Sequence, residues 1–437
     1  MPAAADDDNY PVEFIQHLKT KTGQSNSTST SRHVTAMYRA WYKQLRETDT
    51  ALHSRPAFLS AIVPTITPTN GNRAALPHPE MIETSHSPFM AKEITDYIHK
   101  TNVTHWLKYS AKNVRGRSVN VHIMHCGDDV TINQDDSVRR GIPVEVLARY
   151  RSYVYKIYAW VHFIHPSVAQ DNDCSKTIDL YFYFTPFEKQ FPLAAGHTLG
   201  KVNANTGFTY SCGSNPHPGG KKGTEIIIFR HEEWFKVLVH ETLHNLELDF
   251  NTHAATSLRD IFPGVRHELL LSEAYVETWA RLINLAFYVF YDIYGGNGTA
   301  SEYNLAVRRC LPTECAFSLF QANATLKYMG LSLQKLLDHN PDTAAEFAKK
   351  YSESTNIFAY YVLAGMMVFA ADEFIEWCSE NNAFSLIQAP TGESGTAGFK
   401  KLIDRLSKNE RIKKTIPLLP DSHDIDGGRT MRMTLWH

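Results

Sequence analysis

The chain has 437 residues, of which 43% are hydrophobic and 21% are charged, a composition typical of folded globular proteins. Its 44 lysine and arginine residues almost balance its 46 aspartate and glutamate residues, so the net charge is −2 and neither nucleic acid nor an anionic membrane is an expected partner. The longest apolar run, residues 358–371, is shorter than the roughly 20 residues of a membrane-spanning helix and predicts a buried core helix. An acidic cluster at residues 6–8 stands where a secretory signal carries basic residues, so we expect a protein that is not secreted.

The first 115 residues are expected to form a separate N-terminal region that is mostly helical and partly irregular. Residues 22–32 are rich in Ser and Thr and residues 64–89 are rich in proline, and both compositions interrupt regular structure. Between them, residues 34–48 have apolar side chains at helical spacing. The six cysteines include no C-x-x-C pair, which argues against a zinc ribbon and predicts reduced thiols.

Residues 116–295 are expected to form an α+β core, in which a long helix backs a sheet. The predicted elements are, in chain order, a strand at 118–126, a helix at 141–166, strands at 176–185, 207–212 and 224–230, and helices at 232–248 and 269–291. The strand at 176–185 alternates strictly, with Leu180 and Phe182 on its apolar face, so we expect it to bury that face only. Residues 296–437 are expected to form a mainly helical C-terminal region with a basic, polar end.

One motif in this core is typical of metal-binding sites. Residues 240–244 read His-Glu-Thr-Leu-His, and helical spacing places His240 and His244 on one face, where both can bind one metal ion. Zinc suits these ligands and keeps a position open for water in a catalytic site, and Glu241 lies close enough to act as a general base. The alternative is a helix that carries two histidines by chance. The apolar residues 234–239 before the motif weigh against it, because burying two imidazoles and a carboxylate without a cation is costly.

A catalytic zinc site needs a third protein ligand. The pattern H-E-x-x-H-x-x-G-x-x-H does not apply, because Glu247 and Phe250 stand at its glycine and last histidine positions. Asp249 and His253 are alternatives, although Asp249 on a continuing helix points away from the histidine face. The favoured ligand is Glu273 on the next predicted helix.

Glu277 lies one turn after Glu273 on the same predicted face. A carboxylate there can accept the free N–H of a ligand histidine and thereby fix its tautomer. Two glutamates four residues apart otherwise repel each other, so a dication between the helices accounts for this pair better than two solvated side chains do.

With these residues the sequence resembles the gluzincin class of zinc metallopeptidases, the thermolysin-like group, over about residues 117–290. In that class H-E-x-x-H is followed one helix later by N-E-x-x-x-D; here Ser272 replaces the asparagine and Glu277 replaces the aspartate, and the linker 249–268 is longer than in thermolysin. The resemblance implies a zincin-like core with a mixed sheet, a backing helix, the H-E-x-x-H helix and a helix that carries the glutamate ligand. The combination of FKVLVHETLHNL and SEAYVETWARLIN also resembles an uncharacterised metallopeptidase group of large DNA viruses, which implies a cytoplasmic or virion-associated protein.

The gluzincin class also positions a tyrosine or histidine that donates a hydrogen bond to the oxyanion of the reaction. The downstream candidates are Tyr360, Tyr361 and His267, and we take Tyr360 as the prediction. A tyrosine pair in an apolar helix is more often plain core packing.

The sequence therefore predicts a zinc-dependent hydrolase of peptide bonds, with one zinc ion per chain and a peptide or protein as its substrate. Two alternatives stay open. One is a catalytically inactive protein of the same fold with a structural or assembly role, for instance in a virion, which the long regions on both sides of the core keep open. The other is a metal hydrolase that acts on a non-peptide amide.

Overall fold

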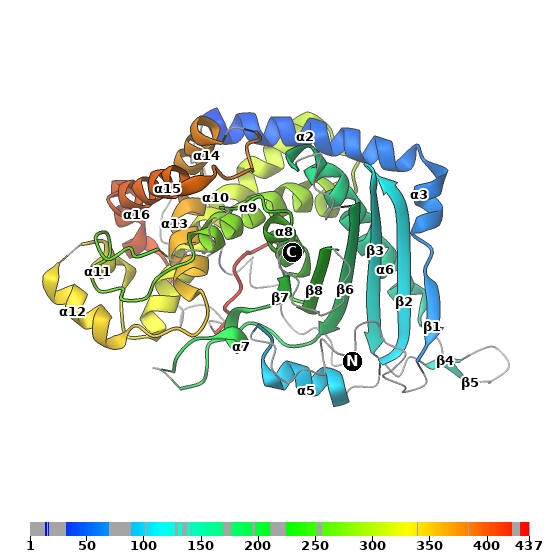
Figure 1. Ribbon diagram of the computed structural model, residues 1–437, viewed down its shortest axis with the longest axis horizontal. Helices are drawn as coiled ribbons and strands as arrows, with labels where there is room; N and C mark the ends of the chain where they lie inside the picture. Colours follow the sequence, from blue (N-terminus) through cyan, green and yellow to red (C-terminus); the bar gives the residue numbers. More distant parts are fainter. Residues whose placement is uncertain are drawn as a thin grey trace. The chain divides into compact units, whose positions relative to one another are not determined.

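The structure is a computed structural model (Figure 1), and it describes residues 14, 16, 32–69, 89–100, 103–126, 130–132, 138–140, 142–168, 176–194, 197–209, 224–250, 256–338, 340–382, 384–421 and 429–436. The chain divides into two compact units. The first comprises Met1–Tyr42, Glu188–Ala204 and Leu248–His437, and the second comprises Lys43–Phe187 and Asn205–Glu247. A mixed six-stranded sheet and many helices confirm the predicted α+β class.

The second unit holds the six-stranded sheet, whose strand order is β1-β2-β3-β6-β8-β7. Its strands are β1 (Thr65–Pro68), β2 (Val103–Val114), β3 (Arg117–Cys126), β6 (Thr177–Thr185), β7 (Gly207–Thr209) and β8 (Thr224–Arg230). β3, β6 and β8 run parallel to one another, whereas β1, β2 and β7 each pair antiparallel with a neighbour. β7 is therefore an edge strand antiparallel to β8. A separate two-stranded sheet consists of β4 (Val130–Ile132) and β5 (Val138–Arg140).

The predicted boundary between an N-terminal region and the core lies inside a β-hairpin. β2 pairs with β3 through a tight turn at Arg115 and Gly116, which both have positive φ angles, as primed hairpin turns require. Along β2, Leu107, Tyr109 and Ala111 are buried, which is the alternation of a half-buried strand. Treating the first 115 residues as a separate region is therefore wrong, because the hydrogen-bonded ladder joins β2 to the sheet.

The central strand β6 is buried on both faces. Helices α3 (Pro56–Ala61), α5 (Lys92–Lys100), α6 (Val144–Ile164) and α8 (Trp234–Asn245) of this unit pack on the sheet. Phe182 and Phe184 contact aromatic side chains of α6 and α8, and Figure 1 shows α6 behind the strands. Tyr181 and Tyr183 are buried on the opposite face, in an apolar cluster with α5. The prediction of one buried face is therefore wrong, because alternation along one strand cannot show that a second helix covers the tyrosine face.

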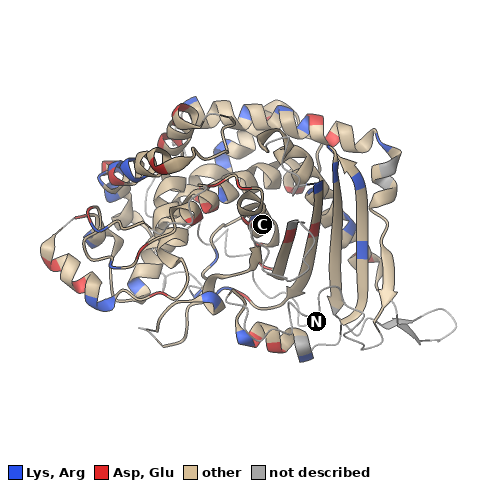
Figure 2. Ribbon diagram, in the orientation of Figure 1, with Lys and Arg blue, Asp and Glu red and all other residues tan. Residues whose placement is uncertain are grey.

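The first unit is mainly helical. Its longer helices are α9 (Leu271–Phe287), α10 (Ala300–Tyr328), α12 (Pro341–Lys350), α14 (Ala371–Asn381) and α15 (Gly392–Ser407). Its shorter segments are α7 (Lys201–Ala204), η4 (Tyr288–Ile293), α11 (Leu333–Leu337), η5 (Phe358–Leu363), α13 (Ala364–Phe369) and α16 (Glu410–Thr415). Figure 2 shows charged residues of both signs on α12 and α15, whereas α13 carries none. Helix α2 (Arg32–His53) confirms the helix predicted at residues 34–48, and the division between the units falls within it.

The apolar run at residues 358–371 is buried as predicted, but it is not one helix. η5 is a π-helix that passes into α13, and the helical path breaks at Ala370. Gly365 lets α13 pack closely on α10, because a Cβ at this position would lie 2.8 Å from the carbonyl oxygen of Ser318. Among the described residues no single helix is long and apolar enough to cross a membrane. Phe358–Phe369 and Ala371–Asn381, two helical segments with a sharp bend between them, are long and apolar enough only when taken together.

The described C-terminal residues, 429–436, lie in the core of the first unit. Met431 and Leu435 are buried, and the backbone of this segment forms hydrogen bonds with residues 189–191. The hydroxyl of Tyr361 donates to the carbonyl of Met431 at 2.5 Å. The prediction of a polar end is therefore wrong for these residues, because residues 431–435 are all buried, Arg432 and Thr434 included.

Candidate metal centre

Apolar packing fixes the helix that carries the H-E-x-x-H motif. α8 follows β8 after a short turn and packs on β7 and β8, with Val237, Leu238 and Val239 buried. Glu233, its N-cap residue, has a left-handed φ of 56° and makes no side-chain capping bond. Such a backbone costs a non-glycine residue about 1 kcal/mol, so burial of the helix, and not its cap, stabilises this end.

His240 and His244 lie on one face of α8, as their spacing predicts. Their Nε2 atoms are 3.2 Å apart, and their ring centroids are 4.8 Å apart. His240 is buried and His244 is half-buried. Two imidazole nitrogens at this distance either share a proton or bind a common cation, because two facing lone pairs repel each other.

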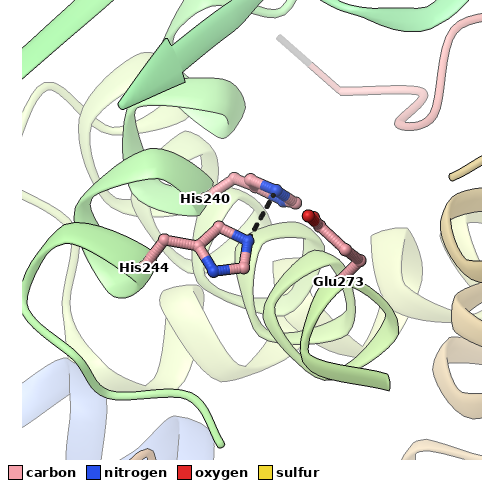
Figure 3. A group of neighbouring side chains, drawn as sticks. All are labelled: His240, His244 and Glu273. Carbon is pink, nitrogen blue, oxygen red and sulfur yellow. Dashed lines mark hydrogen bonds between the residues drawn. The ribbon is translucent and has the colours of Figure 1, made fainter. Parts of the chain in front are cut away.

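Glu273 completes a potential metal site. Among the described residues, the ligand atoms of one group of His, Cys, Asp or Glu side chains converge, namely those of His240, His244 and Glu273, which all lie within 4.8 Å of one another. Figure 3 shows the carboxylate of Glu273 close to the two rings. These three residues, which the sequence analysis selected, can hold a metal ion.

The donor set fits zinc. Two nitrogens that bind zinc tetrahedrally, at Zn–N distances of about 2.0–2.1 Å, lie about 3.3 Å apart. The observed 3.2 Å between the Nε2 atoms is close to this value. Two imidazoles and one carboxylate are also a ligand set of catalytic zinc sites that keep a fourth position open. Little rearrangement of the two histidines would be needed to bind such an ion.

Two features support the carboxylate of Glu273. It lies in the first turn of α9, where the helix dipole favours a negative charge. Its Oε1 accepts a hydrogen bond from Nδ2 of Asn356 at 3.3 Å. Asn356 stands 83 residues further along the chain, two residues before the start of η5. It was not among the predicted residues, because no local pattern connects it to α9.

The end of α8 is fixed to the edge strand of the sheet. Asn245 is fully buried, and its Nδ2 donates to Oγ1 of Thr209 in β7 at 2.7 Å. Thr209 in turn donates to the backbone carbonyl of Glu225 in β8. Glu241 on the same helix is half-buried, whereas its neighbours His240 and Thr242 are buried. These hydrogen bonds therefore fix the end of the motif helix α8 to the edge strand β7.

The chain turns sharply directly after the motif. Glu247 has a left-handed φ of 56°, which glycine adopts most readily, at the position where H-E-x-x-H-x-x-G-x-x-H has its glycine. Phe250, at the position of the last histidine of that pattern, is buried against Tyr275. Asp249 is buried but is not one of the three converging ligands. His253 lies outside the described residues.

Glu277 belongs to a buried ion pair. Its Oε1 lies 2.9 Å from Nε of Arg281, and both side chains are almost completely buried. Arg281 also donates to Oγ of Ser318 at 3.1 Å and to the backbone carbonyl of Tyr360 at 2.7 Å. The pair neutralises two charges that would be costly to bury alone, and it joins α9 to η5. The role of Glu277 in orienting a ligand histidine stays a prediction.

The two tyrosines of η5 have different surroundings. Tyr361 is fully buried, with its hydroxyl bonded to the C-terminal segment, so it is a core residue. Tyr360 is half-buried within the same π-helical turn, a conformation that is frequent at functional sites. His267, the remaining candidate, is exposed. The hydrogen bond from Tyr360 to an oxyanion stays a prediction.

A turn closed by Glu353 precedes η5. The carboxylate of Glu353 accepts hydrogen bonds from the Tyr351 hydroxyl and from the backbone N–H of Phe358, both at 2.7 Å. Burial raises the pKa of the Glu353 carboxyl to about 7, although both hydrogen bonds lower it. Asn356, the partner of Glu273, lies inside this turn.

Comparison of the chain with models of protein families, with curated proteins and with solved structures finds no match to any of them. The function of this chain therefore has to be inferred from the chemistry of its site.

Proposed function

We propose that this protein is a zinc-dependent hydrolase of peptide bonds, in which His240, His244 and Glu273 hold one zinc ion per chain and Glu241 is the general base. The observation that carries the proposal is the convergence of two imidazole nitrogens and one carboxylate oxygen within 4.8 Å. Glu241 follows His240 directly and is half-buried, which suits a base that must meet a water molecule.

Each side chain of the site has a separate role in the reaction. A zinc ion supplies Lewis acidity, which lowers the pKa of water and polarises the carbonyl of a peptide bond. Glu241 accepts a proton from the attacking water as the water oxygen bonds to the carbonyl carbon. It then gives this proton to the amide nitrogen as the C–N bond breaks, so that the products are a carboxylic acid and an amine. Tyr360 donates a hydrogen bond to the carbonyl oxygen as negative charge develops there.

The edge strand β7 favours an extended peptide as the substrate. A peptide that adds to a sheet edge is held by backbone hydrogen bonds, which a non-peptide amide lacks. Gly207 lets β7 lie close to both β8 and α8, because a Cβ there would lie 2.7 Å from Cδ1 of Ile228 and 3.0 Å from Cγ1 of Val237. Together with the bond from Asn245 to Thr209, this close packing places the edge strand beside the motif helix.

The order of the elements supports the gluzincin type. β3, α6, β6, β7, β8, α8 and α9 follow one another along the chain, in the order that the resemblance implies for a zincin-like core. α6 backs a mixed sheet, α8 carries H-E-x-x-H, and the next helix carries Glu273. Of the helical part of the first unit beyond α9, only η5, which carries Tyr360, is given a role in the chemistry.

The test is hydrolysis of a peptide library by the full chain loaded with one equivalent of zinc. We expect cleaved peptides by mass spectrometry, loss of cleavage when 1,10-phenanthroline removes the metal, and recovery when zinc is added back. If the zinc-loaded protein cleaves no peptide but hydrolyses non-peptide amides, the substrate class is wrong. If it cleaves neither, the proposal fails and a structural or assembly role of the fold is favoured.

A further inference from the structure

The carboxylate of Glu273 is held from outside its own helix. Nδ2 of Asn356 donates to Oε1 of Glu273 at 3.3 Å, and both residues belong to the first unit. An amide is a neutral donor, so it can fix one carboxylate oxygen without adding a charge that would compete with a metal ion. A hydrogen bond to Oε1 therefore favours the opposite oxygen, Oε2, as the metal ligand.

The backbone of Asn356 is fixed on both sides. Its carbonyl accepts the N–H of Tyr360 at 2.9 Å, an α-helical hydrogen bond that overlaps the first residues of η5. Before it, the Glu353 carboxylate accepts the N–H of Phe358 and closes the turn in which Asn356 lies. Asn356 therefore belongs to a rigid turn, and its side chain amide reaches α9 from a defined position.

We propose that Asn356 is a positioning residue of the metal centre, which holds Oε1 of Glu273 so that the carboxylate binds zinc through Oε2 alone. This inference rests on the proposed function. A carboxylate that binds through one oxygen leaves a coordination position for water and substrate, whereas binding through both oxygens would occupy that position. Groups that orient ligands in this way typically change metal affinity about 10- to 100-fold when they are removed.

The test is zinc affinity, measured on the full chain by competition with a chromophoric chelator. We expect Asn356→Ala to weaken zinc binding about 10- to 100-fold. Asn356→Asp should weaken it further, because the variant loses the donor and places a second carboxylate against Glu273. The matched control is Asn340→Ala, which removes the cap of α12, a bond from Asp342 N–H to the Asn340 side chain, in the same unit. We expect the control to bind zinc as the wild type does.

A spectroscopic readout separates positioning from general loss of structure. With Co²⁺ in place of zinc, wild-type protein should show the intense visible bands of a four-coordinate site. Asn356→Ala should show weaker bands, because a carboxylate that binds through both oxygens raises the coordination number. Unchanged zinc affinity and an unchanged cobalt spectrum in Asn356→Ala, with zinc lost in Glu273→Ala, would overturn the inference and leave the proposed function intact. A wild-type chain that binds zinc but cleaves no peptide would refute the function alone, and one that binds no zinc would refute both.

Discussion

Replacement of Glu241 by glutamine is expected to abolish peptide hydrolysis while zinc stays bound. The substitution keeps the shape of the side chain and removes its ability to accept a proton, so kcat should fall by about 10²–10⁴-fold, the usual contribution of general acid–base catalysis. His240, His244 and Glu273 remain in place, so the zinc content should not change. The measurement is kcat with a cleaved peptide, alongside zinc per chain by elemental analysis.

The matched control is Glu247→Gln, which removes an exposed carboxylate just beyond the end of the same helix. We expect this variant to keep the wild-type kcat. Retained turnover in Glu241→Gln, with the control equally active, would show that another group accepts the proton and would refute the assigned mechanism.

Replacement of Glu353 by glutamine is expected to remove a pH dependence of stability between about pH 4.5 and 7. Burial raises the pKa of the Glu353 carboxyl from 4.5 to about 7, so the folded protein holds a proton that the unfolded chain has released. The protonated carboxyl makes its full contribution to the free energy of unfolding below pH 4.5, and this contribution is lost as the pH rises through 7. The difference corresponds to about 3 kcal/mol at 1.36 kcal/mol per pKa unit. We expect about 2 kcal/mol, because part of the side chain reaches solvent.

The measurement is urea unfolding of the wild type and of Glu353→Gln at pH 5 and pH 8, without metal. The variant should gain about 2 kcal/mol relative to the wild type between the two pH values. The control is Glu346→Gln, because hydrogen bonds from Lys350 and Lys335 lower the pKa of that carboxyl, so it stays ionised throughout this range. If the free energies of unfolding of Glu353→Gln and the wild type differ by the same amount at pH 5 and at pH 8, Glu353 is ionised at both pH values and its predicted pKa shift is wrong.

The metal ligands were predictable because their signals are local. His240 and His244 share a helix face through their spacing, and Glu273 is a carboxylate near the start of the next helix, α9, which is otherwise mostly apolar. Arg281 had a local signal too, since it lies four residues after Glu277 in that apolar helix. Glu277 was predicted to orient a ligand histidine, and its closer partner Arg281 was not considered.

Asn356 and Asn245 were beyond prediction for a different reason. Each acts through a hydrogen bond to a residue distant in the sequence, namely Glu273 and Thr209. An asparagine in a loop or at a helix end most often satisfies its own backbone, so neither position stands out before the fold is known. Supporting residues of a site are therefore harder to predict than its ligands.

The fold was predictable where the pattern of residues within a single segment determines whether that segment is a helix or a strand. The strands at 118–126, 176–185 and 224–230 and the long helix α6 lie close to their predicted bounds. The errors concern contacts between elements: the pairing of β2 with β3, the covering of Tyr181 by α5, and the burial of residues 429–436. Each depends on a partner far along the chain, which periodicity within a single element does not reveal.

The zinc content of protein purified without added metal shows whether His240, His244 and Glu273 hold an ion. We expect about one zinc ion per chain in the wild type and loss of that zinc in Glu273→Ala, with circular dichroism unchanged. A wild-type chain that binds no zinc even after incubation with excess metal would refute the proposed zinc site and, with it, the proposed function.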